Sequence, residues 1–233
     1  MRYTLGIDTA TGEGSVGLAG DGAALGCERL HPGEHSSGLS SAVHRLLDRQ
    51  GISLERLAAL VVSKGPGSFT GLRIGLAWAK GVAFGIDLPL ILVGAHEAAA
   101  HAHRARSPLL ATLIPAERAH VEAVLWSGGD RAALRWGPEN IVEDDDLFPR
   151  LADEAGGGPL AIAPSTPKLE AALRELLEDG PEAIRSAVTV LSGESLGPAV
   201  AEVGDRAFLE GKRDDLASAS PAYGRAPNAR KPR

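Results

Sequence analysis

A glycine-rich loop is the part of the sequence best suited to bind a ligand. It reads Gly-Pro-Gly-Ser-Phe-Thr-Gly from Gly65 to Gly71, after an apolar run at residues 60–62 that predicts a buried strand. A helix is expected from about Leu72 to Phe84. Backbone N–H groups at such a strand-to-helix junction, together with the helix dipole, favour an anion such as phosphate. The candidate anion-binding residues of the loop are Gly65, Gly67, Ser68 and Thr70.

The same loop also has a purely structural interpretation. It is not a Walker A loop, because no Gly-Lys-Ser/Thr sequence ends it, and it departs from G-x-G-x-x-G by one position. Its glycines would then permit a tight turn and close helix packing, while Ser68 or Thr70 caps the helix. The loop by itself does not decide between the two interpretations.

A carboxylate and a hydroxyl group stand at the end of the first expected strand. Asp8 and Thr9 follow the alternating apolar residues of that strand, and such oxygens could bind Mg²⁺ and phosphate. The alternative is a plain turn in which Asp8 accepts hydrogen bonds from its own neighbouring backbone. Asp8 and Thr9 therefore join the candidate cofactor-binding residues.

Other reactive residues form no convincing site. His96 and His101 imitate the H-E-x-x-H motif with one residue too many, which puts their imidazoles some 140° apart around a helix, so they cannot share a metal. Cys27 lies in an expected strand, and Ser68 has neither an adjacent base nor a nucleophile elbow. We predict no catalytic residue and no metal site.

The elements expected to position these residues alternate between strands and helices. Period-two apolar patterns predict an antiparallel three-stranded meander at the start of the chain, and later runs predict a mixed α/β arrangement with helices on the faces of the sheets. The sequence becomes rich in alanine beyond His96, so we place a boundary near residue 100. The expected parts are residues 1–100 as a first lobe, completed by the C-terminal helix, residues 101–211 as a second, degenerate lobe, and residues 212–233 as a basic tail.

The helix expected after the glycine-rich loop is apolar on nearly every side. Arg73 and Lys80 are its only large polar residues. A helix of this kind is normally buried all round, and its own sheet can cover only one side. We therefore expect a second domain or another chain to cover the rest.

Composition excludes several classes of protein. The chain has 233 residues and a net charge of -6, which argues against this chain alone holding nucleic acid. Its single cysteine excludes an intrachain disulfide and fits a reducing compartment. The apolar stretch before Asp8 is too short for a signal-peptide core, and Lys80 and Asp87 interrupt the most apolar region, so we expect neither export nor a membrane span and predict a cytoplasmic protein.

Several segments together resemble the TsaB family, also called YeaZ. The longest is the string Gly-Pro-Gly-Ser-Phe-Thr-Gly-Leu-Arg-Ile-Gly-Leu-Ala, which is specific. The resemblance covers roughly residues 1–100, and the middle of the chain matches poorly. The matching segments are Leu5–Ala10, His35–Ser36, Gly65–Ala77 with Gly81, and Pro221–Arg225.

The resemblance implies the two-lobed fold of the actin, sugar-kinase and heat-shock-chaperone ATPase superfamily, which is ribonuclease H-like. It also implies a scaffolding subunit, not an enzyme by itself, of the complex that makes threonylcarbamoyladenosine beside the tRNA anticodon. Its partners would be a TsaD-type catalytic subunit and a TsaE-type ATPase. The chain would pair with itself when alone and meet tRNA only through the complex. The resemblance implies no required cofactor and leaves open whether ATP or ADP binds at the subunit interface.

The family pairs its subunits through the two helices of the first lobe, which correspond to residues 36–50 and 72–84 here. The interface residues carried over are Leu39, Val43, Leu72, Arg73, Leu76 and Lys80. Two other functions stay open. The first is an active small-molecule kinase or ATPase that uses Asp8 and the glycine-rich loop. The second is a metallopeptidase, against which the histidine spacing counts strongly.

Overall fold

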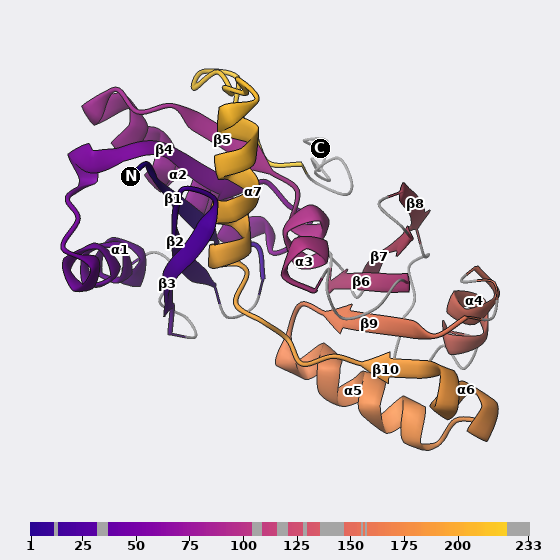
Figure 1. The fold of residues 1–233 in the computed structure, drawn as a ribbon. Helices are drawn as coiled ribbons and strands as arrows, with labels where there is room; N and C mark the ends of the chain where they lie inside the picture. Colours follow the sequence, from indigo (N-terminus) through magenta and orange to yellow (C-terminus); the bar gives the residue numbers. More distant parts are fainter. Residues whose placement is uncertain are drawn as a thin grey trace, which may run out of the picture.

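The computed structural model describes residues 1–11, 14–31, 37–103, 109–115, 121–127, 130–135, 147–154, 156 and 158–222. Within these ranges the chain forms two five-stranded mixed sheets, each with helices packed on it (Figure 1). Each sheet has its own cluster of buried apolar side chains.

The first sheet has the strand order β3-β2-β1-β4-β5. Its antiparallel part is the predicted meander, in which β1 (Tyr3–Asp8), β2 (Ser15–Gly20) and β3 (Ala23–Arg29) pair in turn. On the other side of β1 lie β4 (Leu57–Ser63) and β5 (Leu90–Val93), both parallel. A short 3-10 helix, η1 (Leu54–Arg56), leads into β4. The carboxyl ends of β1, β4 and β5 therefore share one edge of the sheet.

Helices cover both faces of this sheet. On one face α1 (Gly38–Gln50) buries its apolar stripe against β2 and β3, and α2 (Phe69–Ile86) buries its own mainly against β4, with β1 and β5 beside it. On the other face α7 (Gly197–Leu209) crosses all five strands and packs most closely on β1 and β2, and α3 (Ala95–His103) packs against α7 and β6. Because α7 comes last in the sequence, the chain returns to the first sheet after building the second (Figure 1).

The second sheet has the order β10-β9-β6-β7-β8. Helices α4 (Leu147–Glu154), α5 (Pro167–Glu178) and α6 (Glu182–Ala187) follow its strands in the sequence, and residues of α4, α5 and α6 pack in its apolar cluster. The strands are β6 (Leu109–Pro115), β7 (Val121–Ser127), β8 (Asp130–Arg135), β9 (Leu160–Pro164) and β10 (Val188–Val190).

The observed elements differ from the expected ones mainly at their ends. The structure starts α2 at Phe69, three residues before the expected start, because Ser68 caps the helix from inside the glycine-rich loop. The short helix α6 was not expected at all. Of the expected tail, residues 212–222 are described and lie against the first sheet. Residues 223–233, like His35 and Ser36 of the resemblance, are outside the described residues.

Candidate functional site

The glycine-rich loop joins β4 to α2 at the carboxyl edge of the first sheet. The Ser68 hydroxyl accepts a hydrogen bond from Gly71 N at 3.2 Å, which satisfies one of the free N–H groups of the first helical turn. Thr70 lies exposed in that turn. This geometry is the capping arrangement of the structural interpretation.

The loop packs directly on the backbone that follows β1. Ser68 N donates to Ala10 O at 2.7 Å, and Thr9 Oγ1 donates to Gly71 O at 2.7 Å. A Cβ added at Gly67 would overlap the Ala10 carbonyl, and one added at Gly71 would overlap the Thr9 carbonyl. The glycines therefore serve close backbone packing. The space beneath the loop is filled by the chain itself rather than left for a phosphate.

Asp8 faces the interior rather than an open site. It is fully buried; its Oδ1 accepts from Ala10 N at 3.0 Å and its Oδ2 accepts from the Thr11 hydroxyl at 2.5 Å. Burial raises the pKa of the Asp8 carboxyl, although these hydrogen bonds act in the opposite direction. Neither the Asp8 nor the Thr9 side chain reaches solvent, and each is already hydrogen-bonded inside the chain, which favours the turn over a site for Mg²⁺ and phosphate; the binding role of both residues stays a prediction.

Four of the predicted interface residues lie in the interior of the chain. Leu39 and Val43 of α1 are fully buried, and Leu72 and Leu76 of α2 are 1% and 6% exposed. Their side chains belong to the apolar clusters under the two helices. The apolar stripe that helical spacing reveals here is thus the one that packs on the sheet, and a partner contact of these four residues stays a prediction.

The outward side of α2 presents a different set of residues. In Figure 1 α2 lies beside the strands of the first sheet. Its outward positions recur every three or four residues, and Phe84 is 83% exposed. Of the six predicted interface residues Arg73 is the one that is exposed, and its guanidinium lies 3.8 Å from the centre of the Phe69 ring. We call this surface the α2 face; it consists of Arg73, Ala77, Gly81, Phe84 and Gly85.

Four residues of the α2 face were missed from the sequence, namely Ala77, Gly81, Phe84 and Gly85. Their signal was present but ambiguous. Ala77, Gly81 and Phe84 are spaced by four and three residues, as residues on one side of a helix are. The buried stripe of the helix has the same spacing, so spacing alone does not tell the two stripes apart. The sheet covers only one of the two stripes.

Lys80 is engaged within the chain. Its Nζ donates to Ala219 O at 3.2 Å and to Ala217 O at 3.4 Å. These carbonyls belong to the segment that follows α7. Lys80 therefore contacts the chain's own C-terminal segment, and its direct contact with a partner stays a prediction.

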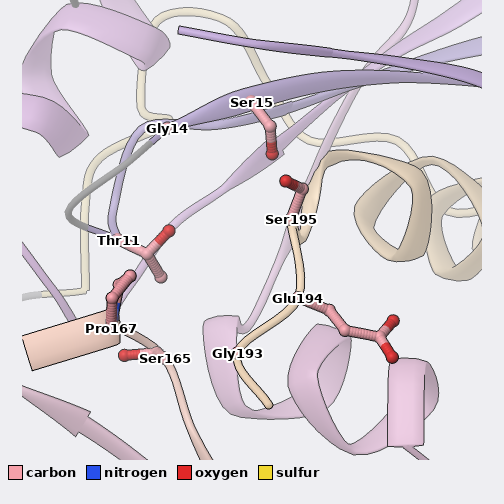
Figure 2. Close-up of a pocket in the computed structure, with 8 residues that line it drawn as sticks. All are labelled: Thr11, Gly14, Ser15, Ser165, Pro167, Gly193, Glu194 and Ser195. Carbon is pink, nitrogen blue, oxygen red and sulfur yellow. The ribbon is translucent and has the colours of Figure 1, made fainter. Parts of the chain in front are cut away.

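A small polar pocket lies where the two sheets meet. Ser15 and Ser195 point their hydroxyl groups toward one another across it (Figure 2), and its volume is about 20 Å³. That is room for about one water molecule, far less than a nucleotide needs. The lining residues are Thr11, Gly14, Ser15, Ser165, Pro167, Gly193, Glu194 and Ser195.

The two histidines of the near-motif face different neighbours. His96 Nδ1 lies 2.8 Å from Thr112 Oγ1 of β6, whereas His101 Nε2 lies 2.9 Å from Glu202 Oε2 of α7. Among the residues with described structure, no three His, Cys, Asp or Glu side chains gather as metal ligands do. In the same ranges, every helix is too short or too polar to span a bilayer.

The sequence is similar to two groups of known proteins. The family model described as "TsaD: tRNA N6-adenosine threonylcarbamoyltransferase" matches residues 30–131. The TsaB protein of Escherichia coli K12, a "tRNA threonylcarbamoyladenosine biosynthesis protein", is 45% identical over 37% of this chain and 38% of its own length. A tRNA N6-adenosine threonylcarbamoyltransferase of Thermus thermophilus is 29% identical over 78% of this chain and 59% of its own length. The stretches matched to these relatives thus span about two fifths and three fifths of their lengths.

The fold is similar to that of solved structures over nearly its whole length. YeaZ from Pseudomonas aeruginosa has a TM-score of 0.69 and 24% identity, covering 96% of this chain and all of its own. The ADPNP-bound activator of 2-hydroxyisocaproyl-CoA dehydratase from Clostridium difficile has a TM-score of 0.54 at 9% identity, covering 92% of this chain and 99% of its own. The mixed α/β fold expected from the resemblance, with its two sheets, is confirmed. The sequence similarity to TsaB proteins and the fold shared with YeaZ together support the resemblance of this chain to the TsaB (YeaZ) family.

Proposed function

We propose that this chain is a subunit of the apparatus that makes tRNA threonylcarbamoyladenosine, and that it acts by docking a TsaD-type subunit on the α2 face. The observation that carries the proposal is the exposed apolar side of α2, where Phe84 is 83% exposed. A large aromatic side chain left in water at the end of an otherwise well-packed helix is typical of an interface anchor. We assign the chain to tRNA threonylcarbamoyladenosine synthesis because the TsaB relatives are named as proteins of that biosynthesis.

The similarity to the proposed partner supports this mode of pairing. The TsaD model matches residues 30–131, which include α1 and α2, so the two subunits would present related helices to each other. Related surfaces can meet about an approximate twofold axis, just as identical surfaces do in a homodimer. The same face would therefore pair with a second copy of this chain when the partner is absent.

A non-catalytic role is part of the proposal. Asp8 is buried, the space under the glycine-rich loop is filled, and the pocket between the sheets has a volume of about 20 Å³. These observations disfavour the kinase or ATPase alternative. We propose further that the paired subunits recruit a TsaE-type ATPase, that tRNA is met only through the complex, and that this subunit works in the cytoplasm without a cofactor.

The test is co-purification with the TsaD-type subunit of the same organism, followed by light scattering. Wild type should form a complex of one copy of each chain, and Phe84→Asp should abolish it with the circular dichroism unchanged. Leu209→Asp is the matched control, because Leu209 is 62% exposed at the end of α7, on the opposite face of the sheet. If the wild-type chain does not bind the TsaD-type subunit but hydrolyses ATP by itself, the scaffold proposal is wrong.

A further inference from the structure

The segment that follows α7 turns back along the edge of the first sheet. Asp214 N donates to Leu90 O at 2.8 Å, and Leu92 N donates to Asp214 Oδ2 at 2.7 Å. Lys212 Nζ donates to Leu92 O at 2.6 Å. We call residues Lys212–Ala222 the strap. In Figure 1 it is the yellow segment that leaves the end of α7 and passes β5.

A second group of contacts ties the strap to α2. Lys80 Nζ of α2 donates to the carbonyl groups of Ala217 and Ala219, and Ala222 N donates to Lys64 O at 2.7 Å, just before the glycine-rich loop. Leu216 and Ala219 pack against the apolar cluster that lies under α1 and α2. The strap therefore lies on the same side of the sheet as α2 and runs beside that helix toward its N-terminal end.

The other border of α2 is α1. Trp78 Nε1 of α2 donates to the Ser40 hydroxyl of α1 at 2.8 Å. The α2 face thus lies between two flanks of this chain, α1 on one side and the strap on the other. The exposed residues of the strap include Asp215, Ala217, Ser218 and Ser220.

The area of the α2 face shows that a partner must reach beyond it. An α-helix of 18 residues is about 27 Å long and about 10 Å wide. One side of it therefore offers roughly 270 Å², about a third of the roughly 800 Å² that each partner buries in a stable interface. A subunit seated on α2 has to cover the neighbouring flanks as well.

We propose that the strap is a built-in part of the docking surface, so that a TsaD-type subunit contacts α2 and the strap together. Lys80 then acts as a positioning residue, because it holds the strap carbonyls beside the helix rather than touching the partner. This inference rests on the proposed function. It adds that partner affinity depends on residues more than 130 positions from α2 in the sequence.

The decisive experiment measures the affinity of full-length variants for the purified TsaD-type subunit by titration calorimetry. Ala217→Arg places a long charged side chain on the exposed strap and leaves the Ala217 carbonyl in place for Lys80. Ala171→Arg makes the same change on the exposed surface of α5 and is the matched control. We expect Ala217→Arg to weaken binding by about tenfold or more and Ala171→Arg to leave it within about twofold.

Two further measurements separate docking from a merely structural strap. Lys80→Met removes the ammonium group that holds the strap and should weaken binding in the same direction as Ala217→Arg. Hydrogen exchange of the amides of residues 215–222 should slow when the partner is added. The inference is overturned if Phe84→Asp abolishes binding while Ala217→Arg binds like wild type and the strap amides gain no protection. If Phe84→Asp also binds like wild type, the proposed function itself fails.

Discussion

The ion pair between Arg2, near the start of the chain, and Asp205 of α7 allows a quantitative test of how α7 is held on the first sheet. Asp205 of α7 accepts hydrogen bonds from Arg2 Nε at 2.9 Å, from Arg2 Nη2 at 2.9 Å and from the Thr4 hydroxyl at 2.9 Å. The Asp205 side chain is 1% exposed and that of Arg2 is 26% exposed. We predict that Asp205→Asn destabilises the protein by about 2–3 kcal/mol.

The size of this effect follows from the geometry. Breaking a fully buried pair costs about 3–5 kcal/mol, because a charge is left without a partner in the interior. Here Arg2 can regain water, and asparagine keeps one acceptor oxygen, so the expected cost is smaller. For a chain of this size, about 2–3 kcal/mol corresponds to a fall in Tm of roughly 4–12 °C.

The pH dependence of the free energy of unfolding gives a second, independent test of the Arg2–Asp205 pair. The hydrogen bonds from Arg2 hold the pKa of Asp205 below its ordinary value. A carboxyl whose pKa is lowered by folding stabilises the protein above its unfolded pKa, and that stabilisation is lost as the pH falls through the lower folded pKa. The difference between wild type and Asp205→Asn should therefore be complete at pH 7 and shrink below about pH 4.

The assay is urea unfolding followed by circular dichroism at several pH values. Asp48→Asn, a change to an exposed carboxylate on α1, is the control and should leave the free energy of unfolding within about 0.5 kcal/mol of wild type. An Asp205→Asn variant as stable as the control at pH 7 would refute the reasoning.

Two more predictions concern the glycines and the buried carboxylate. Gly71→Ala should cost about 2 kcal/mol or more because its Cβ would overlap the Thr9 carbonyl, whereas Gly81→Ala, with open space around it, should stabilise by up to about 1 kcal/mol in urea unfolding. Equal stabilities would contradict this account of the loop. Because burial raises the pKa of Asp8, ionising it opposes folding, and stability falls as the pH rises from the unfolded to the folded pKa. Asp8→Asn should therefore unfold at a higher urea concentration than wild type at pH 7, and the gap should narrow toward pH 4; a less stable variant would show that the ionised Asp8 is needed.

Local patterns in the sequence predict much of the first lobe. The period-two runs of β1 and β2, the turn between β2 and β3, and the apolar run of β4 depend on neighbouring residues alone, so the meander and the strand before the loop could be read from the sequence. The residues of the glycine-rich loop were found for the same reason. Their role was not, because a loop that binds phosphate and a loop that packs on a strand need the same glycines.

Helical periodicity reveals that α2 has apolar residues on more than one side, and thus predicts a surface for a partner. It cannot tell which stripe faces the sheet. The structure assigns Leu72 and Leu76 to the interior and Phe84 to the surface, because burial depends on which side of α2 meets β1 and β4. That choice is made by packing between elements distant in the sequence.

The sequence by itself determined the resemblance to the TsaB family, the mixed α/β class and the presence of an unusually apolar helix. Those properties reside in short segments and their spacing. Only the tertiary structure decided that Asp8 is buried, that Lys80 holds the strap, and that Arg2 meets Asp205. Each of these contacts joins residues that chain folding brings together, and the free energy of burying or pairing a charged group depends on those neighbours rather than on residues nearby in the sequence.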